Sequence, residues 1–170
     1  MMYLKKFIQL SLFFLAFNGY VANGQTASIT AVSEPLSADS LIAFAKTQLG
    51  TNYCYATSDP EKGFDCSGFV YFVFAHYKIK VPRSSKEYTR FGKTVPLDSA
   101  KAGDVIVFTG TNAKKRGPGH VGIIISCMNG TPTFIHSSSG KKKGVIISDF
   151  NESPYYKKRF IKIVRVAELN

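Results

Sequence analysis

The apolar positions in the first half of the chain follow the spacing of helices that face a core. Between Ser37, a good N-cap, and Gly50, a common helix stop, the pattern predicts a helix over residues 38–49. Its apolar face consists of Leu41, Ile42, Ala45 and Leu49. After Asp65, a second N-cap, residues 66–77 are apolar nearly all round, which is typical of a central buried helix.

Turn signals separate these two helices from a third. Residues 51–64 carry turn-forming Asn, Pro and Gly residues and are predicted to form a loop. Ser84, followed three positions later by Glu87, is a capping box. A short third helix is therefore expected before Gly92.

Beyond residue 95 the pattern changes to that of strands. The Asn129-Gly130 pair marks a hairpin turn between two of them. The expected strands are Val105–Thr109, Val121–Ser126, Thr133–Ser137, Val145–Ser148 and Phe160–Val166. Because helices come first and strands follow with short connections, we expect an α+β fold with a mostly antiparallel sheet of five to six strands.

The start of the chain has the pattern of a secretory signal peptide. Lys5 and Lys6 precede an apolar run over residues 7–17, and small residues follow at Ala22 and Gly24. The run is too short for a bilayer core, which needs about 20 residues. We expect cleavage after Gly24 and export to the periplasm, the cell envelope or the medium. A buried N-terminal helix is the alternative interpretation.

Three segments are therefore expected along the chain. Residues 1–24 form the signal peptide, residues 25–36 a short leader, and residues 37–170 a single domain. The first cysteine after the apolar run is Cys54, too far away to carry a lipid. We accordingly expect no membrane anchor once the signal peptide is removed.

Composition and charge narrow the class of partner. Hydrophobic residues make up 45% of the 170 residues, which excludes a disordered chain because disordered chains lack the apolar surface that offsets ordering entropy. Lys and Arg number 22 against 11 Asp and Glu, a formal charge of +11. This charge favours nucleic acid or an anionic envelope polymer as partner. For an exported chain we expect the envelope polymer; general solubility is the alternative explanation of the charge.

Cys66 occupies an unusual position between the capping Asp65 and the expected buried helix. The unpaired N–H groups and the positive dipole at a helix N-terminus favour a thiolate. The same N–H groups can hold a developing oxyanion. The sequence therefore predicts a reactive thiol, with a buried structural cysteine as the alternative.

Two of the three histidines fall on neighbouring predicted strands. His120 opens the first of these strands and His136 lies on the second, so the two can meet across the sheet. A catalytic thiol needs a base, and a second polar group must fix the tautomer of that base. Together with Cys66 the pair indicates nucleophilic catalysis. His76, near the end of the second helix, is interpreted as structural.

A zinc site is the chemical alternative, with Cys66, His120 and His136 as ligands. The sequence contains neither a close pair of ligands nor a carboxylate beside the histidines, so we expect no metal and no cofactor. The remaining cysteines, Cys54 and Cys127, are interpreted as buried free thiols, although export permits a disulfide.

Several short motifs follow one another in a fixed order along the chain. They are Phe64–Val70 (FDCSGFV), Val81–Ser85 (VPRSS), Ala102–Val105 (AGDV), Gly119–Ile123 (GHVGI) and Phe134–Ser137 (FIHS). In this combination, and with a closing strand near residues 160–166, the chain resembles the NlpC/P60 family of cell-wall cysteine peptidases over roughly residues 38–166.

The resemblance implies a papain-like, NlpC-type catalytic domain that hydrolyses peptidoglycan stem peptides. The bond implied is that between γ-D-glutamate and the diamino acid, cleaved through a thioester. By the same resemblance Cys66 is the nucleophile, His120 the base and His136 the residue that orients the base. The expected partners are stem peptides rather than nucleic acid, and a monomer is expected.

The resemblance extends to residues that would support catalysis, but the sequence differs from the family pattern in one place. Tyr53 matches a family tyrosine whose hydroxyl lies near the nucleophile, and Asp65 and Ser67 are expected to support the substrate or the oxyanion. After this tyrosine the family usually has an aromatic residue and two glycines. Here the residues are Tyr55, Ala56 and Thr57, so the choice of substrate stays open.

Two other functions compete with the endopeptidase. One is an amidase that cuts the bond between sugar and peptide, and the other is a non-catalytic wall-binding module, which the Cys-His-His set disfavours. Three basic clusters could recruit an anionic wall, with solvated loops as the alternative. They are Lys114–Arg116, Lys141–Lys143 and Lys157–Arg159, and the first two flank the two strand histidines.

Overall fold

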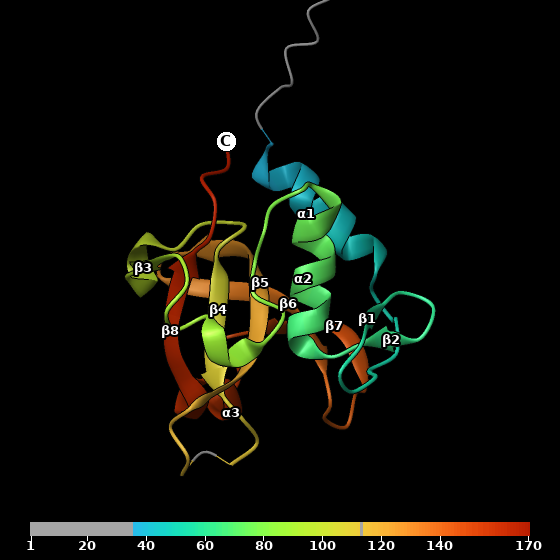
Figure 1. The fold of residues 1–170 in the computed structure, drawn as a ribbon. Coiled ribbons are helices and arrows are strands. Elements are labelled where there is room, and N and C mark those ends of the chain that lie inside the picture. Colours follow the sequence, from blue (N-terminus) through green and yellow to red (C-terminus); the bar gives the residue numbers. More distant parts are fainter. Residues whose placement is uncertain (1–35, 113) are drawn as a thin grey trace, which may run out of the picture. The chain divides into compact units, whose positions relative to one another are not determined.

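Helices α1 and α2 pack on a six-stranded sheet (Figure 1). The computed structural model describes residues 36–170 except residue 113. These residues belong to one unit, Glu34–Asn170. The predicted signal peptide, and the predicted leader up to residue 35, lie outside the described residues. Within those residues, no helix is both long and apolar enough to span a membrane.

The order of elements matches the predicted class. The helices are α1 (Ala38–Thr47), α2 (Cys66–His76) and α3 (Pro154–Arg159), with 3₁₀ turns at Ser85–Glu87 and Leu97–Ser99. A small hairpin is formed by β1 (Ser58–Asp59) and β2 (Gly63–Phe64). The main sheet contains β3 (Lys93–Val95), β4 (Val105–Thr109), β5 (Pro118–Met128), β6 (Thr131–Ser138), β7 (Gly144–Asp149) and β8 (Phe160–Arg165). Its order is β3-β8-β4-β5-β6-β7 with every neighbouring pair antiparallel, which confirms the α+β prediction.

The sheet is covered on both faces, which explains its long aliphatic runs. Successive residues of β4 point to opposite faces, as a strand requires. Val105 and Val107 join the core beneath α1 and α2. Ile106 and Phe108 join a second, smaller core on the other face, to which Tyr156 of α3 contributes.

Several predicted boundaries are wrong for identifiable reasons. Helix α1 ends at Thr47, and Leu49 is 45% exposed rather than on the buried face. The chain turns there because the N–H of Gly50 binds the carbonyl of Val145 on β7. The predicted third helix is only the 3₁₀ turn Ser85–Glu87.

Other elements were absent from the prediction. The loop predicted over residues 51–64 contains the β1–β2 hairpin. Strand β3 is too short for a periodic signal and exists because it pairs with β8. Helix α3 is capped by Ser153 and spans six residues. The Asn129-Gly130 turn is confirmed, with φ of 51° and 71° at its two residues, and it joins β5 to β6.

Candidate active site

The first turn of α2 is held by a charged cluster. The carboxylate of Asp65 accepts a hydrogen bond from the backbone N–H of Gly68 at 2.6 Å and so caps the helix. Both Asp65 oxygens also bind the guanidinium of Arg83, at 3.0 and 2.9 Å. The hydroxyl of Ser67 donates to the same carboxylate at 3.1 Å. These contacts fix the direction in which α2 begins, and Cys66 is its first residue.

Glycines allow close approaches around this helix start. A side-chain carbon at Gly68 would lie 1.9 Å from the carbonyl oxygen of Thr57, so only glycine fits there. Gly63 has φ of +110°, and a side chain on it would meet the carbonyl of Asn52 at 2.4 Å. The loop that carries Tyr53 can therefore pack directly against the segment leading into Cys66.

Tyr53 is attached to that segment by backbone pairing. It forms an isolated parallel bridge with Phe64, and the N–H of Cys54 binds the carbonyl of Phe64 at 3.1 Å. Burial, and to a smaller extent the nearby Cys66, raise the pKa of the Tyr53 hydroxyl. Tyr53 therefore faces Cys66 as a protonated hydrogen-bond donor.

The two strand histidines meet as the sequence predicts. Nε2 of His120 and Nδ1 of His136 are hydrogen-bonded at 3.0 Å, with the rings perpendicular. Gly122 makes room for this pair, because a side chain on it would lie 3.0 Å from the Cβ of His136. The thiol of Cys66 contacts the carbonyl oxygen of Gly119, the residue before His120, at 3.9 Å.

His136 is fully buried and its second nitrogen is also occupied. Its Nε2 lies 3.0 Å from the hydroxyl oxygen of Ser148 on β7 and 3.3 Å from that of Tyr156 on α3. The hydrogen bonds therefore form a chain that runs from His120 to His136 and from there to Ser148 or Tyr156. Sequence reasoning missed Ser148 and Tyr156, because no local motif ties these positions to the histidines.

Burial sets the charge states of the site. Burial, and to a smaller extent the positive charge of Arg159, lower the pKa of His120 to about 4. Burial lowers the pKa of His136 well below its ordinary value, and the neighbouring His120 adds to this. Both imidazoles are therefore neutral at neutral pH.

The pKa of the Cys66 thiol does not follow the expectation of a favoured thiolate. Burial raises the pKa of the Cys66 thiol, and the negative charge of Asp65 raises it too. Backbone N–H groups of Val121 and Ser67 act in the opposite direction but are outweighed. The loss of hydration around a thiolate thus exceeds the benefit of the helix N-terminus. Thiol and imidazole face the site as a neutral pair.

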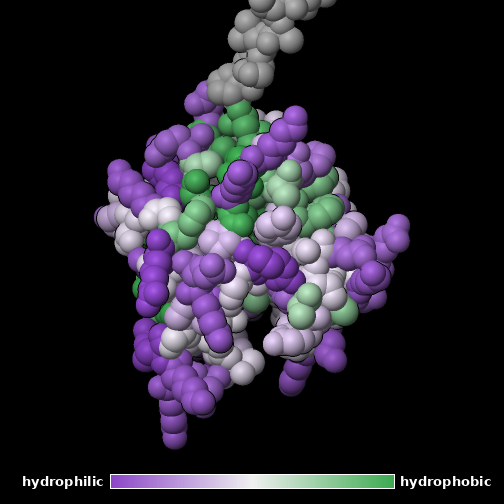
Figure 2. Space-filling model, in the orientation of Figure 1, coloured by the Kyte–Doolittle hydropathy of each residue, from purple (hydrophilic) through white to green (hydrophobic). Residues whose placement is uncertain are grey.

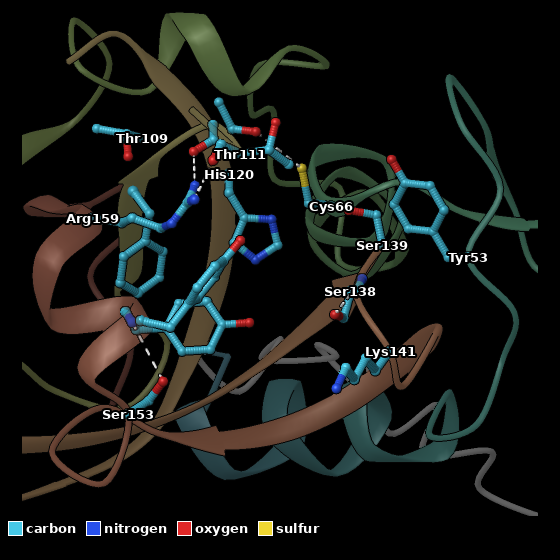
Figure 3. Close-up of a pocket in the computed structure, with 16 residues that line it drawn as sticks. Tyr53, Cys66, Thr109, Thr111, His120, Ser138, Ser139, Lys141, Ser153 and Arg159 are labelled. Atoms are coloured by element: carbon cyan, nitrogen blue, oxygen red, sulfur yellow. Dashed lines mark hydrogen bonds between the residues drawn. The ribbon is translucent and has the colours of Figure 1, made fainter. Parts of the chain in front are cut away.

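Cys66 and His120 line one cleft of about 570 Å³ (Figure 3). Tyr53 lies on one side of it and α3 on the other. The lining includes Lys141 and Arg159, which belong to two of the basic clusters, but neither Asp65 nor Ser67. The space-filling view shows a hollow among hydrophilic side chains at the end of the molecule where α3 lies (Figure 2).

The other histidine and the other two cysteines do not line the cleft. His76 stacks on Phe44 with ring centroids 3.7 Å apart. Cys54 and Cys127 are free and half-buried rather than fully buried. Within residues 36–112 and 114–170, no group of three or more His, Cys, Asp or Glu residues is arranged to hold a metal ion.

Comparison with known proteins agrees with this arrangement. The model of the NlpC/P60 family matches residues 50–165. The chain belongs to the NlpC/P60 family. A solved NlpC/P60 structure from Bacillus cereus superposes with a TM-score of 0.67 at 31% identity, covering 78% of this chain and 41% of that one. The fold is therefore the NlpC-type fold that the motifs predict.

Curated relatives give the family context. The γ-DL-glutamyl hydrolase of Bacillus subtilis is 31% identical over 131 residues, which are 77% of this chain and 30% of that protein. The murein DD-endopeptidase MepS/murein LD-carboxypeptidase of Escherichia coli is 39% identical over 107 residues, or 62% of this chain and 51% of that protein. The chain thus spans about half or less of the length of these relatives.

Proposed function

We propose that this NlpC/P60 chain is a cysteine endopeptidase that hydrolyses stem peptides of peptidoglycan. The observation that carries the proposal is the cleft in which Cys66 and His120 lie together, with His136 bonded behind His120. The name of the murein endopeptidase supports this class of substrate, and the name of the glutamyl hydrolase supports hydrolysis at a γ-glutamyl bond.

The hydrogen bonds support one proposed role for each histidine nitrogen. Nε2 of His120 is bonded to His136, which leaves Nδ1 of His120 to act as the base. For Nδ1 to be unprotonated, Nε2–H of His120 must donate to Nδ1 of His136. Nε2–H of His136 then donates to Ser148 or Tyr156. This tautomer is the one that a base needs, so His136 orients His120 and fixes its proton.

Catalysis then begins from the neutral pair of thiol and imidazole. His120 takes the thiol proton as the sulfur of Cys66 attacks the substrate carbonyl, and backbone N–H groups at the start of α2 stabilise the oxyanion. The C–N bond breaks, and the amine leaves with the proton held by His120. Water, deprotonated by His120, hydrolyses the thioester and regenerates the thiol.

We place the cleaved bond between γ-D-glutamate and the diamino acid. The resemblance of the motifs and the name of the Bacillus subtilis relative support this choice. The Escherichia coli relative is named for a different bond of murein, so a DD-endopeptidase is the second candidate. An amidase that releases the whole stem peptide remains the alternative in a related fold.

Export is part of the proposal, because peptidoglycan lies outside the cytoplasm. The basic and apolar pattern of residues 1–24 supports it. Cleavage after Gly24 would leave Gln25 first and the catalytic domain over residues 37–170. N-terminal sequencing of protein recovered from the envelope or medium would check this.

The decisive experiment removes the nucleophile. We expect Cys66→Ala to keep its fold and lose hydrolysis of purified stem peptides, and Cys66→Ser to be nearly as inactive because a hydroxyl is a weaker nucleophile. Cys127→Ala, which removes a half-buried free thiol outside the cleft, is the matched control and should keep activity. Mass spectrometry of the products identifies the bond: a new amino terminus on the diamino acid supports the proposal.

Three other results would contradict the proposed endopeptidase function. Substantial hydrolysis by Cys66→Ala would remove Cys66 from the mechanism. Loss of activity with EDTA that zinc restores would favour the metal alternative. Release of intact stem peptides from the sugar would indicate the amidase instead.

A further inference from the structure

The charged groups in the cleft all have the same sign. Among its lining residues, those charged at neutral pH are Lys141 and Arg159, both cations. They approach from different elements, Lys141 from the loop between β6 and β7 and Arg159 from the last residue of α3. In the close-up they lie on opposite sides of His120 (Figure 3). A ligand between them meets positive charge from two directions.

Arg159 is held in place, unlike a free surface arginine. Its two terminal nitrogens donate hydrogen bonds to the backbone carbonyls of Gly110 and Thr111. Its guanidinium lies over the ring of Tyr155, 4.1 Å from the centroid. These contacts use two of the five N–H donors of a guanidinium, so three stay available for a ligand. Because the side chain is already ordered, binding an anion costs little further entropy.

We propose that Arg159 and Lys141 form a subsite for a substrate carboxylate close to the scissile bond. The proposal rests on the proposed function, since stem peptides supply such groups. A γ-linked glutamate keeps its α-carboxylate free, four bonds from the scissile carbonyl carbon. A diamino acid with a second carboxyl group would carry another free carboxylate on the other side of the bond. The shared chemistry is a carboxylate bound by one guanidinium and one ammonium group.

The subsite also links substrate binding to the base. The positive charge of Arg159 contributes to lowering the pKa of His120. A carboxylate bound against Arg159 neutralises that charge, so the pKa of His120 rises when the correct substrate is bound. A substrate with a carboxamide in the same place leaves His120 the weaker base. The subsite should therefore affect kcat as well as KM.

The test compares the hydrolysis of matched substrates by the parent enzyme and by its variants. Synthetic stem peptides would carry the glutamyl α-carboxylate, its carboxamide, or an amidated diamino acid, and kcat/KM would be measured for each. A charge-assisted hydrogen bond is worth about 1.5–3 kcal/mol, so the parent should prefer the free acid by roughly 10- to 100-fold. The position whose amidation causes the loss identifies which carboxylate is bound.

Two variants remove the subsite and two serve as controls. Arg159→Gln should reduce the preference for the free acid in kcat/KM to severalfold or less. Lys141→Gln should reduce this preference in part. Arg116 also donates to two backbone carbonyls but does not line the cleft, so Arg116→Gln should keep the full preference. Lys142→Gln changes the charge beside Lys141, outside the lining, and should keep it too. If Arg159→Gln does not fold by circular dichroism, Lys141→Gln provides the comparison.

A binding measurement separates this proposal from the proposed function. The acid and amide peptides would be titrated by calorimetry into full-length Cys66→Ala, with and without Arg159→Gln. Tighter binding of the acid that depends on Arg159 supports the subsite even if the parent cleaves a different bond. The subsite proposal would be overturned by equal binding of the acid and amide peptides, or by no binding of either. It would also be overturned if Arg159→Gln kept the preference for the acid peptide.

Discussion

At the scale of single residues, the site depends on which atoms of Cys66, His120 and His136 hold protons. The thiol of Cys66 and both imidazoles are neutral because burial disfavours their charged forms. In the proposed mechanism His120 is an effective base only in one tautomer. That tautomer depends on its hydrogen-bond partner His136, whose Nε2 in turn contacts Ser148 and Tyr156. The side chains that accept from this nitrogen should therefore influence catalysis without touching the substrate.

We predict that Ser148→Ala lowers kcat by roughly tenfold, about 1.4 kcal/mol, with little change in KM. The loss follows from removing the 3.0 Å partner of His136, which leaves the longer contact to Tyr156. Ser148→Thr keeps a hydroxyl and should recover most of the rate. The double variant with Tyr156→Phe should be slower than either single variant.

The tautomer can be observed directly. Nitrogen NMR of labelled protein should show His136 protonated at Nε2 in the parent and a mixture of tautomers when Ser148 and Tyr156 are both replaced. Ser126→Ala, an exposed serine on β5, is the control and should change neither the rate nor the spectrum. An unchanged rate in the double variant would mean that His136 needs no outer partner.

At the scale of elements, the start of α2 determines the position of Cys66, the proposed nucleophile. The helix begins at Cys66 because Asp65 caps it and Arg83 holds Asp65. Its first turn lies directly against the loop that contains Thr57. The motif Cys66-Ser67-Gly68 thus combines the proposed nucleophile with the glycine that permits this contact.

We predict that Gly68→Ala lowers the free energy of unfolding by about 3 kcal/mol, the upper range for overpacking. The new methyl group would overlap the carbonyl of Thr57, so α2 or the loop must move, and activity should fall with stability. Urea unfolding measures the change. The control is Gly117→Ala, where nothing lies within 4 Å, and its midpoint should stay close to that of the parent. Equal midpoints for the two variants would show that the contact is easily relieved.

At the scale of the whole molecule, the buried histidines make folding depend on pH. An unfolded histidine takes up a proton near its ordinary pKa of 6.5, whereas folded His120 does so only near pH 4. Between these values the unfolded state binds more protons, so stability falls as the pH falls. His136, whose pKa is also lowered, acts in the same direction.

We predict that the free energy of unfolding falls as the pH is lowered from 6.5 towards 4, by up to about 1.4 kcal/mol per pH unit for each of the two histidines. Urea unfolding at a series of pH values measures the slope. His136→Gln should have a shallower slope, because one of the two groups no longer titrates. A stability that is constant between pH 6.5 and 4.5 would contradict the buried, neutral assignment.

Local sequence signals predicted much of this molecule. Caps and turn residues placed the start of α2, the whole of β4 and the hairpin between β5 and β6, because those features depend on neighbours within a few residues. The same signals located Cys66 at a helix start and the two histidines on adjacent strands. Short elements such as β3 and α3 were missed, because pairing with distant strands or packing on the sheet creates them.

The tertiary structure decided what surrounds those residues. The pairing of β7 with β6 brings Ser148 to His136. The packing of α3 on the sheet brings Tyr156 to His136 and Arg159 to the cleft. Burial also reversed the expectation for the Cys66 thiol, because a helix N-terminus is a local feature whereas desolvation depends on every element that closes over the site. The amino-acid sequence by itself therefore identified the candidate reacting groups, and the fold determined their protonation and the charges that line the cleft.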